Sequence, residues 1–594
     1  MKLSDYVVDF LSKQGIKHVF VITGGASVHL IDSIAKHNDI EYICTLHEQA
    51  GAMAADAYAR ITKNLGAAIS TSGPGATNML TGTCCAYYDS VPVIYITGQV
   101  TTFRLKKNMG VRQLGFQETD VVDIFKPITK YAVRIEDPKM IKYELQKACH
   151  IAKSGRPGPV LIDIPDDLQR QEISINGLNQ YLPDKLQGSL LNFEKIIGQC
   201  ANLIETAQRP VLILGWGIRL SGAEIEAKEF IEKLEIPFAP TWAMLDFLPY
   251  DHPLFIGTFG SHGSRYGNFT VQNADLIISI GARLDTREAG SPITTFGREA
   301  KKIIIDIDRS ELKKFKTLGM KAEILINSDA KEFLKIFNKK CHSMKKSNIG
   351  NWLKKIKSWK RRYPICKREY SNEIKVNPYV FVKRLSKQLV EGDIIFVDTG
   401  CALAWMMQAF ETKKEQRLIH DFNNTAMGYA LPGSIGACFA NNKQRVICVT
   451  GDGSLQMNIQ ELSTVIRHQL PIKIFLINNR GYSMIQQTQD QWLNSRYEAS
   501  SIEGGLGFPD FIKVAKANGY KTNAIEKNQE ATKKIKEAIN YQGPFFCSVN
   551  ISHRHRVIPQ VIFGRPIEDS EPFLERKEFL ENMIVKPHIS SITP

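Results

Sequence analysis

Short apolar runs alternate with longer amphipathic segments along nearly the whole chain, and this alternation constrains the fold more than any other sequence feature. The runs have the length of strands and are rich in β-branched residues: Ala67–Thr71, Val91–Thr97, Val160–Ile164, Val211–Leu214, Leu276–Ile280, Ile303–Ile307, Ile394–Val397, Val446–Thr450 and Ile472–Ile477. Strands separated by helix-length segments form βαβ units and therefore parallel sheets. Because the runs lack polar alternation, we expect helices on both faces of each sheet.

Two polar stretches divide the 594 residues into domain-sized blocks. The first lies around Arg170–Asn192, after the segment GRPGPVLIDIP. The second, Asn338–Asn377, is rich in lysine, and for it we expect exposed helices and a crossing loop. The sequence thus predicts an α/β protein with three doubly wound parallel-sheet domains and a tail that could serve as a lid, with boundaries at 1–172, 190–340, 375–552 and 553–594.

Composition and charge argue against several classes of function. Hydrophobic residues make up 43% of the chain, but no apolar run reaches the ~18–20 residues of a membrane span, and the N-terminus is amphipathic rather than a secretory signal. The net charge of +15 is dispersed and accompanies no nucleic-acid-binding motif, so we expect no nucleic acid and no membrane as partner. Eleven cysteines without a CxxC pair are typical of a cytoplasmic protein.

The sharpest chemical signal is an Asp-Gly turn between a strand and a helix. The letters GDG at residues 451–453 follow the strand RVICVT, and the next strand, Ile472–Ile477, ends in two asparagines. An isolated Asp-Gly turn is common and indicates little. The complete span GDGSLQMNIQELSTVIRHQLPIKIFLINN, with strand, turn, helix, strand and asparagines in order, is far more specific.

The residues of this span have the chemistry of a magnesium–diphosphate site. The carboxyl ends of neighbouring parallel strands meet at one sheet edge, beside a helix N-terminus. Mg²⁺ prefers hard oxygen ligands. Asp452 can offer a carboxylate oxygen, Asn479 an amide oxygen and Gly481 a backbone carbonyl, while Gly453 would let the backbone approach a phosphate closely.

The chain resembles the catalytic subunit family of the thiamine diphosphate (ThDP)-dependent acetolactate synthases, also called acetohydroxyacid synthases. The likeness covers nearly all of the three blocks. Besides the GDG–NN span it is carried by the stretches GGAS, HEQAGAMAADAYAR, STSGPGATN, GFQET, SGRPGPVLIDIP, GARLDTR and AMGYALPGSIGA.

This resemblance implies a pyrimidine-binding domain, a central FAD-binding domain and a diphosphate-binding domain, with ThDP, Mg²⁺ and FAD as cofactors. The implied reaction decarboxylates a 2-oxo acid, here pyruvate, and joins the acyl unit to a carbonyl acceptor, as in branched-chain amino acid biosynthesis. The family places ThDP between the pyrimidine domain of one subunit and the diphosphate domain of another. A homodimer or homotetramer is therefore implied, and a regulatory subunit is compatible with it.

The resemblance also assigns the reaction centre. Glu48 matches the glutamate that hydrogen-bonds the aminopyrimidine ring and drives its imino tautomer, although alone it could be an ordinary helix start. Residues that match the lining of the reaction centre are Gly25, Phe116 and Gln117, for which a plain turn or a buried amide is the alternative.

Cofactor-binding residues follow in the same way. The Thr425 carbonyl would accept the pyrimidine amine, and Met427 would prop ThDP into its bent shape, although a core methionine also fits. The positions matching diphosphate contacts are Gly400, Gly451, Gly453 and Ser454. Those matching FAD contacts, after strands as phosphate and ribose sites require, are Gly215, Gly217, Arg283, Arg287, Asp306 and Asp329.

Four positions depart from the family pattern. Cys401-Ala402 follow Gly400 where the family has Gln-His, Asp166 replaces a lysine near the substrate channel, Thr488 replaces an acceptor-pocket tryptophan, and Thr23 replaces a proline. The changed acceptor pocket leaves three alternatives open. They are two-carbon transfer to a nucleotide-linked keto-sugar of surface polysaccharide synthesis, simple 2-oxo acid decarboxylation, and a non-catalytic relative that binds ThDP or FAD.

Overall fold

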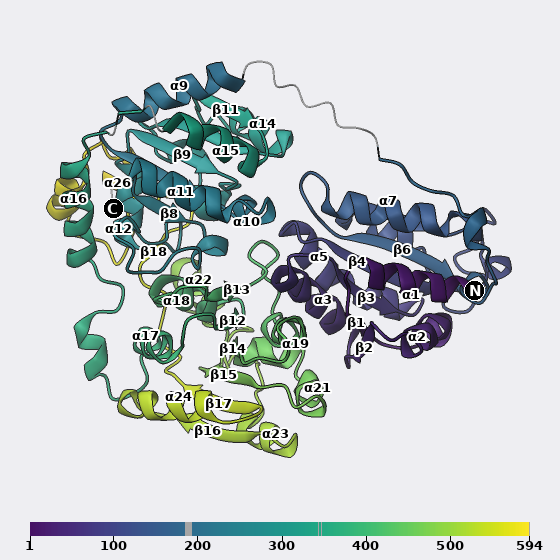
Figure 1. Ribbon diagram of the computed structural model, residues 1–594. Coiled ribbons are helices and arrows are strands. Elements are labelled where there is room, and N and C mark those ends of the chain that lie inside the picture. The colour runs from purple at the N-terminus through teal and green to yellow at the C-terminus, as the bar shows by residue number, and fades with distance from the viewer. Residues whose placement is uncertain (184–192, 342–343, 346, 593–594) are drawn as a thin grey trace.

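The structure is a computed structural model that describes residues 1–183, 193–341, 344–345 and 347–592. Residues 184–192, which include part of the first predicted linker and the predicted start of the central domain, lie outside this description. The described residues form three large sheets whose paired strands are all parallel, each flanked by helices (Figure 1). The predicted fold class is therefore confirmed.

The first sheet has the strand order β2-β1-β3-β4-β6-β5. Its strands are β1 His18–Val21, β2 Glu41–Cys44, β3 Gly66–Ser70, β4 Val93–Gln99, β5 Tyr131–Arg134 and β6 Val160–Pro165. Its helices are α1 Leu3–Lys13, α2 Val28–Ala35, α3 Glu48–Thr62, α4 Pro74–Asn78, α5 Leu80–Tyr88, α6 Val121–Phe125, α7 Ile141–Lys153 and α8 Asp166–Gln169. The apolar faces of α1, α2 and α7 cover one face of the sheet, and α3 and α5 cover the other.

The second sheet has the order β11-β10-β9-β7-β8. Its strands are β7 Pro210–Leu214, β8 Phe238–Pro240, β9 Leu276–Ile280, β10 Lys301–Asp306 and β11 Ile324–Asn327. Its helices are α9 Phe193–Thr206, α10 Gly217–Leu220, α11 Glu224–Leu234, α12 Arg265–Gln272, α13 Thr286–Ala289, α14 Arg309–Thr317 and α15 Ala330–Cys341.

The third sheet has the order β13-β12-β14-β15-β17-β16. Its strands are β12 Ile394–Val397, β13 Arg417–Ile419, β14 Val446–Gly451, β15 Ile472–Asn478, β16 Lys521–Ile525 and β17 Phe545–Asn550. Its helices are α17 Pro378–Gln388, α18 Cys401–Ala409, α19 Ala430–Ala440, α20 Asp452–Met457, α21 Glu461–Arg467, α22 Ser483–Trp492, α23 Phe511–Ala517 and α24 Ala531–Asn540.

Small residues let the first and third domains pack backbone to backbone. Helix α3 of the first domain lies against α19 of the third, and both contribute to one apolar core. A Cβ atom at Gly436 on α19 would lie only 2.0 Å from the carbonyl oxygen of Ala54 on α3. The alanine- and glycine-rich sequences of both helices are thus explained by their close approach.

The lysine-rich second linker differs from the expectation of exposed helices. Its helix α16, Gly350–Arg362, buries Trp352, Ile356 and Trp359, which are spaced so that they share one face. The Nε1 atom of Trp359 donates to Asn582 Oδ1 at 2.7 Å. Lys354 and Lys357 are exposed on the other side, so the helix is amphipathic and its apolar face belongs to the core.

The tail after β17 lies mainly against the central domain. It contains the two-stranded antiparallel pair β18 Gln560–Val561 and β19 Ser570–Glu571, and the helices α25 Arg576–Asn582 and α26 Ile589–Ile592. Arg298 forms an ion pair with buried Glu568 at 2.5 Å, and Asn273 donates to the Asn582 carbonyl at 3.1 Å. No helix in the described part of the chain is both long and apolar enough to span a membrane.

Candidate active site

Each sheet has a switch point, where consecutive strands leave in opposite directions, and the predicted site residues gather there. In the third sheet the switch point lies between β12 and β14, in the second between β7 and β9, and in the first between β1 and β3. Loops at the carboxyl ends of the strands leave a crevice at such points, which is where α/β proteins bind ligands. The fold therefore provides three candidate ligand-binding positions, one in each sheet.

The Asp452 carboxylate is fixed by backbone N–H groups at the switch point of the third sheet. Its Oδ1 atom accepts from Gly453 at 2.7 Å, and its Oδ2 atom accepts from Asn479 at 3.1 Å and from Arg480 at 2.5 Å. Burial raises the pKa of Asp452 to about 6, and these N–H groups oppose that rise. The carboxylate is thus held in one orientation beside the N-terminus of α20.

Three oxygen atoms converge beside this carboxylate. The side-chain oxygen of Asn479 lies 3.1 Å from Asp452 Oδ2 and 3.0 Å from the Gly481 carbonyl oxygen, with no hydrogen between them. Turning the amide over would convert both contacts into hydrogen bonds. A cation also explains them, because neighbouring ligands of an octahedral Mg²⁺ ion with bonds of about 2.1 Å are roughly 3 Å apart.

A cavity opens in front of these oxygens. The predicted residues that line it are Met427, Gly400, Gly451, Gly453, Ser454, Asp452, Asn479 and Gly481. No cluster of three or more His, Cys, Asp or Glu side chains that could hold a metal occurs among the described residues. A metal at this point would therefore need further oxygens, which a diphosphate supplies.

Gly453 is required by a neighbouring ring rather than by the space for a phosphate. A Cβ atom at Gly453 would lie 2.1 Å from Cε1 of Tyr482. The sequence predicted that Gly453 lets the backbone approach a phosphate closely. In the structure, the missing Cβ is directed at the ring of Tyr482 instead. Gly400, in contrast, adopts φ 88° and has open space around it, as a loop facing a ligand would.

Glu48 starts helix α3 at the end of β2 and is oriented by a neighbouring amide. Asn78 on α4 donates to Glu48 Oε2 at 2.9 Å. A Cβ atom at Gly75 would lie 3.4 Å from Glu48 Oε1 and 2.7 Å from Cγ2 of Thr71. The segment SGPGATN, residues 72–78, therefore packs against the Glu48 carboxylate.

The other three residues predicted for the reaction centre lie around the same segment. Gln117 adopts φ 65°, and a Cβ atom at Gly73 would lie 3.2 Å from its Cβ. Phe116 is 84% exposed, and Gly25 has no heavy atom near its missing Cβ. None of these residues, nor Glu48, lines the cavity at Asp452. Within one chain, the structure does not bring the two halves of the predicted site together.

Sequence analysis missed two carboxylates that build these loops. Buried Glu118 accepts from the N–H groups of Lys106 at 2.7 Å and Leu114 at 2.8 Å, and so shapes the loop that carries Phe116 and Gln117. At the end of β12, Asp398 accepts from Gly428 at 2.9 Å, directly after Met427. Asp398 could have been recognised in the sequence as an acidic residue directly after a strand. No local sequence pattern marks Glu118.

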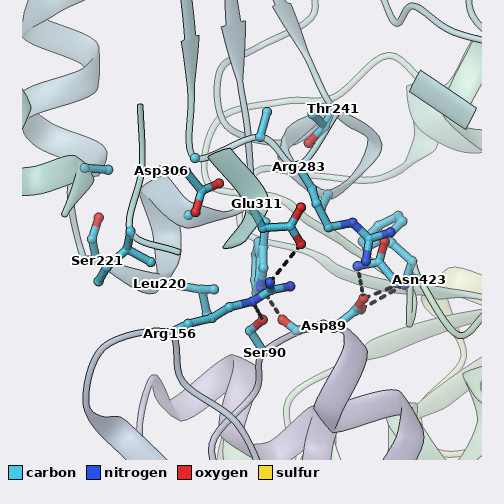
Figure 2. A pocket seen from close by; sticks show the side chains of 18 of the residues that line it. Asp89, Ser90, Arg156, Leu220, Ser221, Thr241, Arg283, Asp306, Glu311 and Asn423 are labelled. Atoms are coloured by element: carbon cyan, nitrogen blue, oxygen red, sulfur yellow. Dashed lines mark hydrogen bonds and ion pairs between the residues drawn. The ribbon is translucent and has the colours of Figure 1, made fainter. Parts of the chain in front are cut away.

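A second cavity lies at the switch point of the central sheet (Figure 2). The predicted FAD residues that line it are Gly217, Arg283, Arg287, Asp306 and Asp329. Arg156, which sequence analysis did not single out, also lines it and pairs with Glu311 at 3.0 Å. Burial raises the pKa of Asp306 to about 6. Guanidinium groups suit a diphosphate and carboxyl groups suit hydroxyls, so the lining fits a dinucleotide.

Gly215 does not line this cavity, and its N–H group is already used. It donates to the Ile280 carbonyl at 2.9 Å, and the Gly217 N–H donates to the Gly281 carbonyl at 3.0 Å. A Cβ atom at Gly215 would lie 2.1 Å from the Gly281 oxygen. Both glycines therefore allow the loops after β7 and β9 to touch, instead of presenting N–H groups to a phosphate.

Comparison with known protein families decides the identity of this architecture. Models of the thiamine pyrophosphate enzymes match residues 1–124 as the N-terminal TPP binding domain, 197–336 as the central domain and 398–549 as the C-terminal TPP binding domain. The chain belongs to the thiamine pyrophosphate enzyme family, and within it to the acetolactate synthase large subunits. The oxygens of Asp452, Asn479 and Gly481, called the oxygen centre below, lie within residues 398–549, which match the C-terminal TPP binding domain.

Similarity to individual members extends over almost the whole chain. The "Probable acetolactate synthase large subunit" of Methanocaldococcus jannaschii is 36% identical over 93% of this chain and 92% of its own length. The acetolactate synthase large subunit of Cyanidium caldarium is 33% identical over 94% of both chains. Acetolactate synthase 3, chloroplastic, of Brassica napus is 33% identical over 96% of this chain and 86% of its own length.

The unusual residues of this family member lie at identifiable places. Asp166 has the imidazole of His29 at 3.6 Å, so its charge has a cationic neighbour when His29 is protonated. Thr488 lines a further cavity, which shares Met484 with the cavity at Asp452. In the same cavity Trp492, one helical turn further along α22, packs edge-to-face on Phe563 of the tail. An aromatic wall therefore exists near the position where the family tryptophan is replaced.

Proposed function

We propose that this protein decarboxylates pyruvate and joins the resulting two-carbon unit to the carbonyl of a second pyruvate, giving 2-acetolactate and carbon dioxide. Its relatives are named as acetolactate synthases. The observation that carries the proposal is that Asp452 and Asn479, at the ends of β14 and β15, lie beside the Gly481 carbonyl at the switch point of a TPP binding domain. A non-catalytic relative would have no need to retain the Glu48 carboxylate as well.

The oxygen centre would hold Mg²⁺ and, through it, the diphosphate of ThDP. Asp452, Asn479 and the Gly481 carbonyl provide three protein oxygens, and diphosphate oxygens and water would complete the shell. Met427 lines the same cavity and would support the bend of the cofactor. ThDP supplies a carbon nucleophile and an electron sink for the decarboxylation.

Glu48 would hold a proton at the aminopyrimidine ring. Its Oε2 atom accepts from the Asn78 amide at 2.9 Å, which fixes the direction of the carboxylate. A carboxylate hydrogen-bonded to a ring nitrogen favours the tautomer whose other nitrogen can take up a proton. Asn78 is thus a positioning residue for Glu48.

We infer that the active site is completed by a second copy of the chain. Glu48, Gln117 and Phe116 lie on the first domain, and none of them lines the Asp452 cavity of the same chain. The Phe116 ring, which is 84% exposed, belongs to a surface that a second diphosphate domain would cover. A homodimer with two shared sites, alone or paired into a tetramer, satisfies both half-sites.

FAD is the proposed ligand of the cavity in the central domain. Arg156, Arg283 and Arg287 offer guanidinium groups on its wall, and Asp306 and Asp329 offer carboxyl groups. The diphosphate and the ribose or ribityl hydroxyls of the dinucleotide match these two sets of groups. The reaction above needs no net electron transfer, so FAD would have a structural role.

Compartment and subunit partners follow from two further observations. All eleven cysteines are free, which fits a reducing compartment such as the cytoplasm. The relatives are named as large subunits. A smaller regulatory subunit is therefore part of the proposal.

The proposal is tested by incubating the purified protein with ThDP, Mg²⁺, FAD and pyruvate while both products are measured. We expect carbon dioxide and acetolactate in equal amounts. Formation of carbon dioxide without acetolactate would indicate a simple decarboxylase. If pyruvate is not consumed, the proposed function is wrong. In the same assay Glu48→Gln should form no acetolactate. Glu41→Gln, which changes an exposed glutamate on β2, is the matched control and should behave like wild type.

A further inference from the structure

Glu288 on α13 is a partly buried carboxyl group that lines the central-domain cavity and has one unsatisfied oxygen. Its Oε2 atom is shielded from solvent and makes no hydrogen bond among the described residues. Its backbone N–H donates to Asp285 Oδ1 at 3.1 Å, so the unsatisfied atom, Oε2, belongs to the side chain alone. Buried polar atoms nearly always have partners, and an exception on a cavity wall indicates a missing ligand.

The neighbouring charged groups are occupied with other partners. Arg283 donates to Asp285 Oδ2 at 2.9 Å rather than to Glu288. The Arg287 guanidinium lies over the Trp242 ring, 4.6 Å from its centroid. On α14, Lys314 donates to the Arg283 carbonyl and to Glu311, both at 2.5 Å. Among the described residues, none of these three cations forms a hydrogen bond or ion pair with Glu288, although their charges still act on it.

The backbone that carries Glu288 has little room to move. A Cβ atom at Gly260 would lie 3.0 Å from the Glu288 Cα and 2.3 Å from the Arg287 carbonyl oxygen. The Ser261 N–H donates to the same Arg287 oxygen at 2.7 Å. Because α13 is held this closely, the Glu288 side chain cannot leave the cavity wall by a shift of its backbone.

Burial raises the pKa of Glu288 to about 7; the Asp285 charge adds to this rise, and Arg287, Arg283 and Lys314 oppose it. A substantial fraction of the carboxyl is therefore protonated near neutral pH. A ligand that donates a hydrogen bond would favour the carboxylate, and the proton would leave. A ligand that only accepts would favour the protonated form.

We infer that Glu288 binds the dinucleotide of this cavity, accepting a hydrogen bond from one of its hydroxyl or N–H groups. The inference rests on FAD as the proposed ligand of the cavity. Glu288 complements the arginines, because they recognise the diphosphate while the carboxylate recognises a neutral donor such as a sugar or ribityl hydroxyl. Binding then releases a proton from Glu288.

The test compares flavin-free wild type, Glu288→Gln and Glu288→Leu with Glu299→Gln, an exposed glutamate of the same domain. FAD is titrated calorimetrically near pH 7 in two buffers of different ionisation enthalpy, which gives affinity and proton release together. We expect wild type and Glu299→Gln to release a fraction of a proton per FAD and Glu288→Gln to release none. Glu288→Leu should bind FAD roughly tenfold to a hundredfold more weakly, the typical effect of losing a hydrogen bond to a charged group.

Thermal unfolding of the flavin-free proteins separates ligand binding from a structural role. Removal of an unsatisfied buried carboxyl should leave the melting temperature of Glu288→Leu equal to or above that of wild type. A lower melting temperature together with weaker FAD binding would overturn the inference, since it would indicate a structural residue. Unchanged FAD affinity and proton release in both Glu288 variants would also overturn it. If folded wild type binds no FAD, the proposed cofactor fails and the inference fails with it.

Discussion

The backbone N–H of Thr425 donates to the Asp421 carbonyl at 2.9 Å and holds Thr425 at φ 51°. The next N–H, of Ala426, donates to the Asp421 side chain at 2.9 Å. A β-branched residue at positive φ is strained, typically by about 1–3 kcal/mol, and persists only when its surroundings enforce it. Two positions further along, Met427 lines the cavity at Asp452. Buried Asp421 therefore sets the backbone conformation of the residues proposed to contact ThDP.

This relationship predicts an epistatic pair. Asp421→Ala should weaken ThDP binding and lower stability, because the strained turn loses an acceptor. Thr425→Gly, which adopts positive φ without strain, should restore a large part of both in the double variant. Equilibrium unfolding and ThDP titration of the four proteins measure the coupling. Additive effects of the two substitutions would contradict this role of Asp421.

Asp452→Ala should abolish Mg²⁺-dependent retention of ThDP while the protein stays folded. In wild type, the affinity for ThDP should decrease as the pH is lowered through about 6. Burial raises the pKa of Asp452 to about 6, so protons compete with the metal below this pH. ThDP titration with and without EDTA checks both statements. Glu503→Gln, an exposed carboxylate after α22, should behave like wild type. Retention of ThDP by Asp452→Ala would remove the basis of the magnesium assignment.

Asp163 in β6 predicts a pH dependence of stability outside the sites. Burial raises its pKa from 3.8 to about 7, although Thr97 donates to it at 2.6 Å and Gln99 at 3.1 Å. Since the folded state holds this proton more tightly, its contribution to the free energy of unfolding is complete below the unfolded pKa. That contribution declines, by up to a few kcal/mol, as pH rises through about 7.

Asp163→Asn should remove this part of the decline. The measurement is the free energy of unfolding in urea at several pH values between about 5 and 8, for wild type and variant. The difference between the two curves isolates Asp163 from the other titrating groups. Parallel curves would show that its folded-state pKa is not raised.

The contact between α3 and α19 makes a packing prediction with a built-in control. Gly436→Ala would place a methyl group 2.0 Å from the Ala54 carbonyl oxygen, and we expect a loss of about 1–3 kcal/mol in stability. Gly198→Ala, in α9 with nothing near the new Cβ, should instead be neutral or stabilising by up to about 1 kcal/mol. Chemical denaturation of both variants compares them. Equal effects would contradict the close approach of the two helices.

The fold class and the oxygen centre could be predicted from the sequence because each depends on local order along the chain. Apolar runs and helical segments alternate, so parallel sheets follow. Asp452 and Asn479 come directly after neighbouring strands, so their meeting at one sheet edge follows as well. No knowledge of distant packing was needed for either inference.

Other features depend on contacts between segments far apart in the chain. The ring of Tyr482 next to Gly453, the loops that meet at Gly215, and the unsatisfied carboxyl of Glu288 have no local signal. The lysines of α16 concealed an apolar face, because its buried residues are few and widely spaced. The proposed sharing of the active site between two chains could be inferred only from family resemblance, since Glu48 does not line the Asp452 cavity of its own chain.

Co-expression of Glu48→Gln and Asp452→Ala chains tests most directly whether Glu48 of one chain and Asp452 of another form one acetolactate-producing site. Each variant alone should be inactive. In mixed dimers one of the two sites combines an intact Glu48 with an intact Asp452, so random assembly should restore acetolactate formation to about a quarter of wild type. Activity in either single variant, or none in the mixture while wild type is active, would contradict the account.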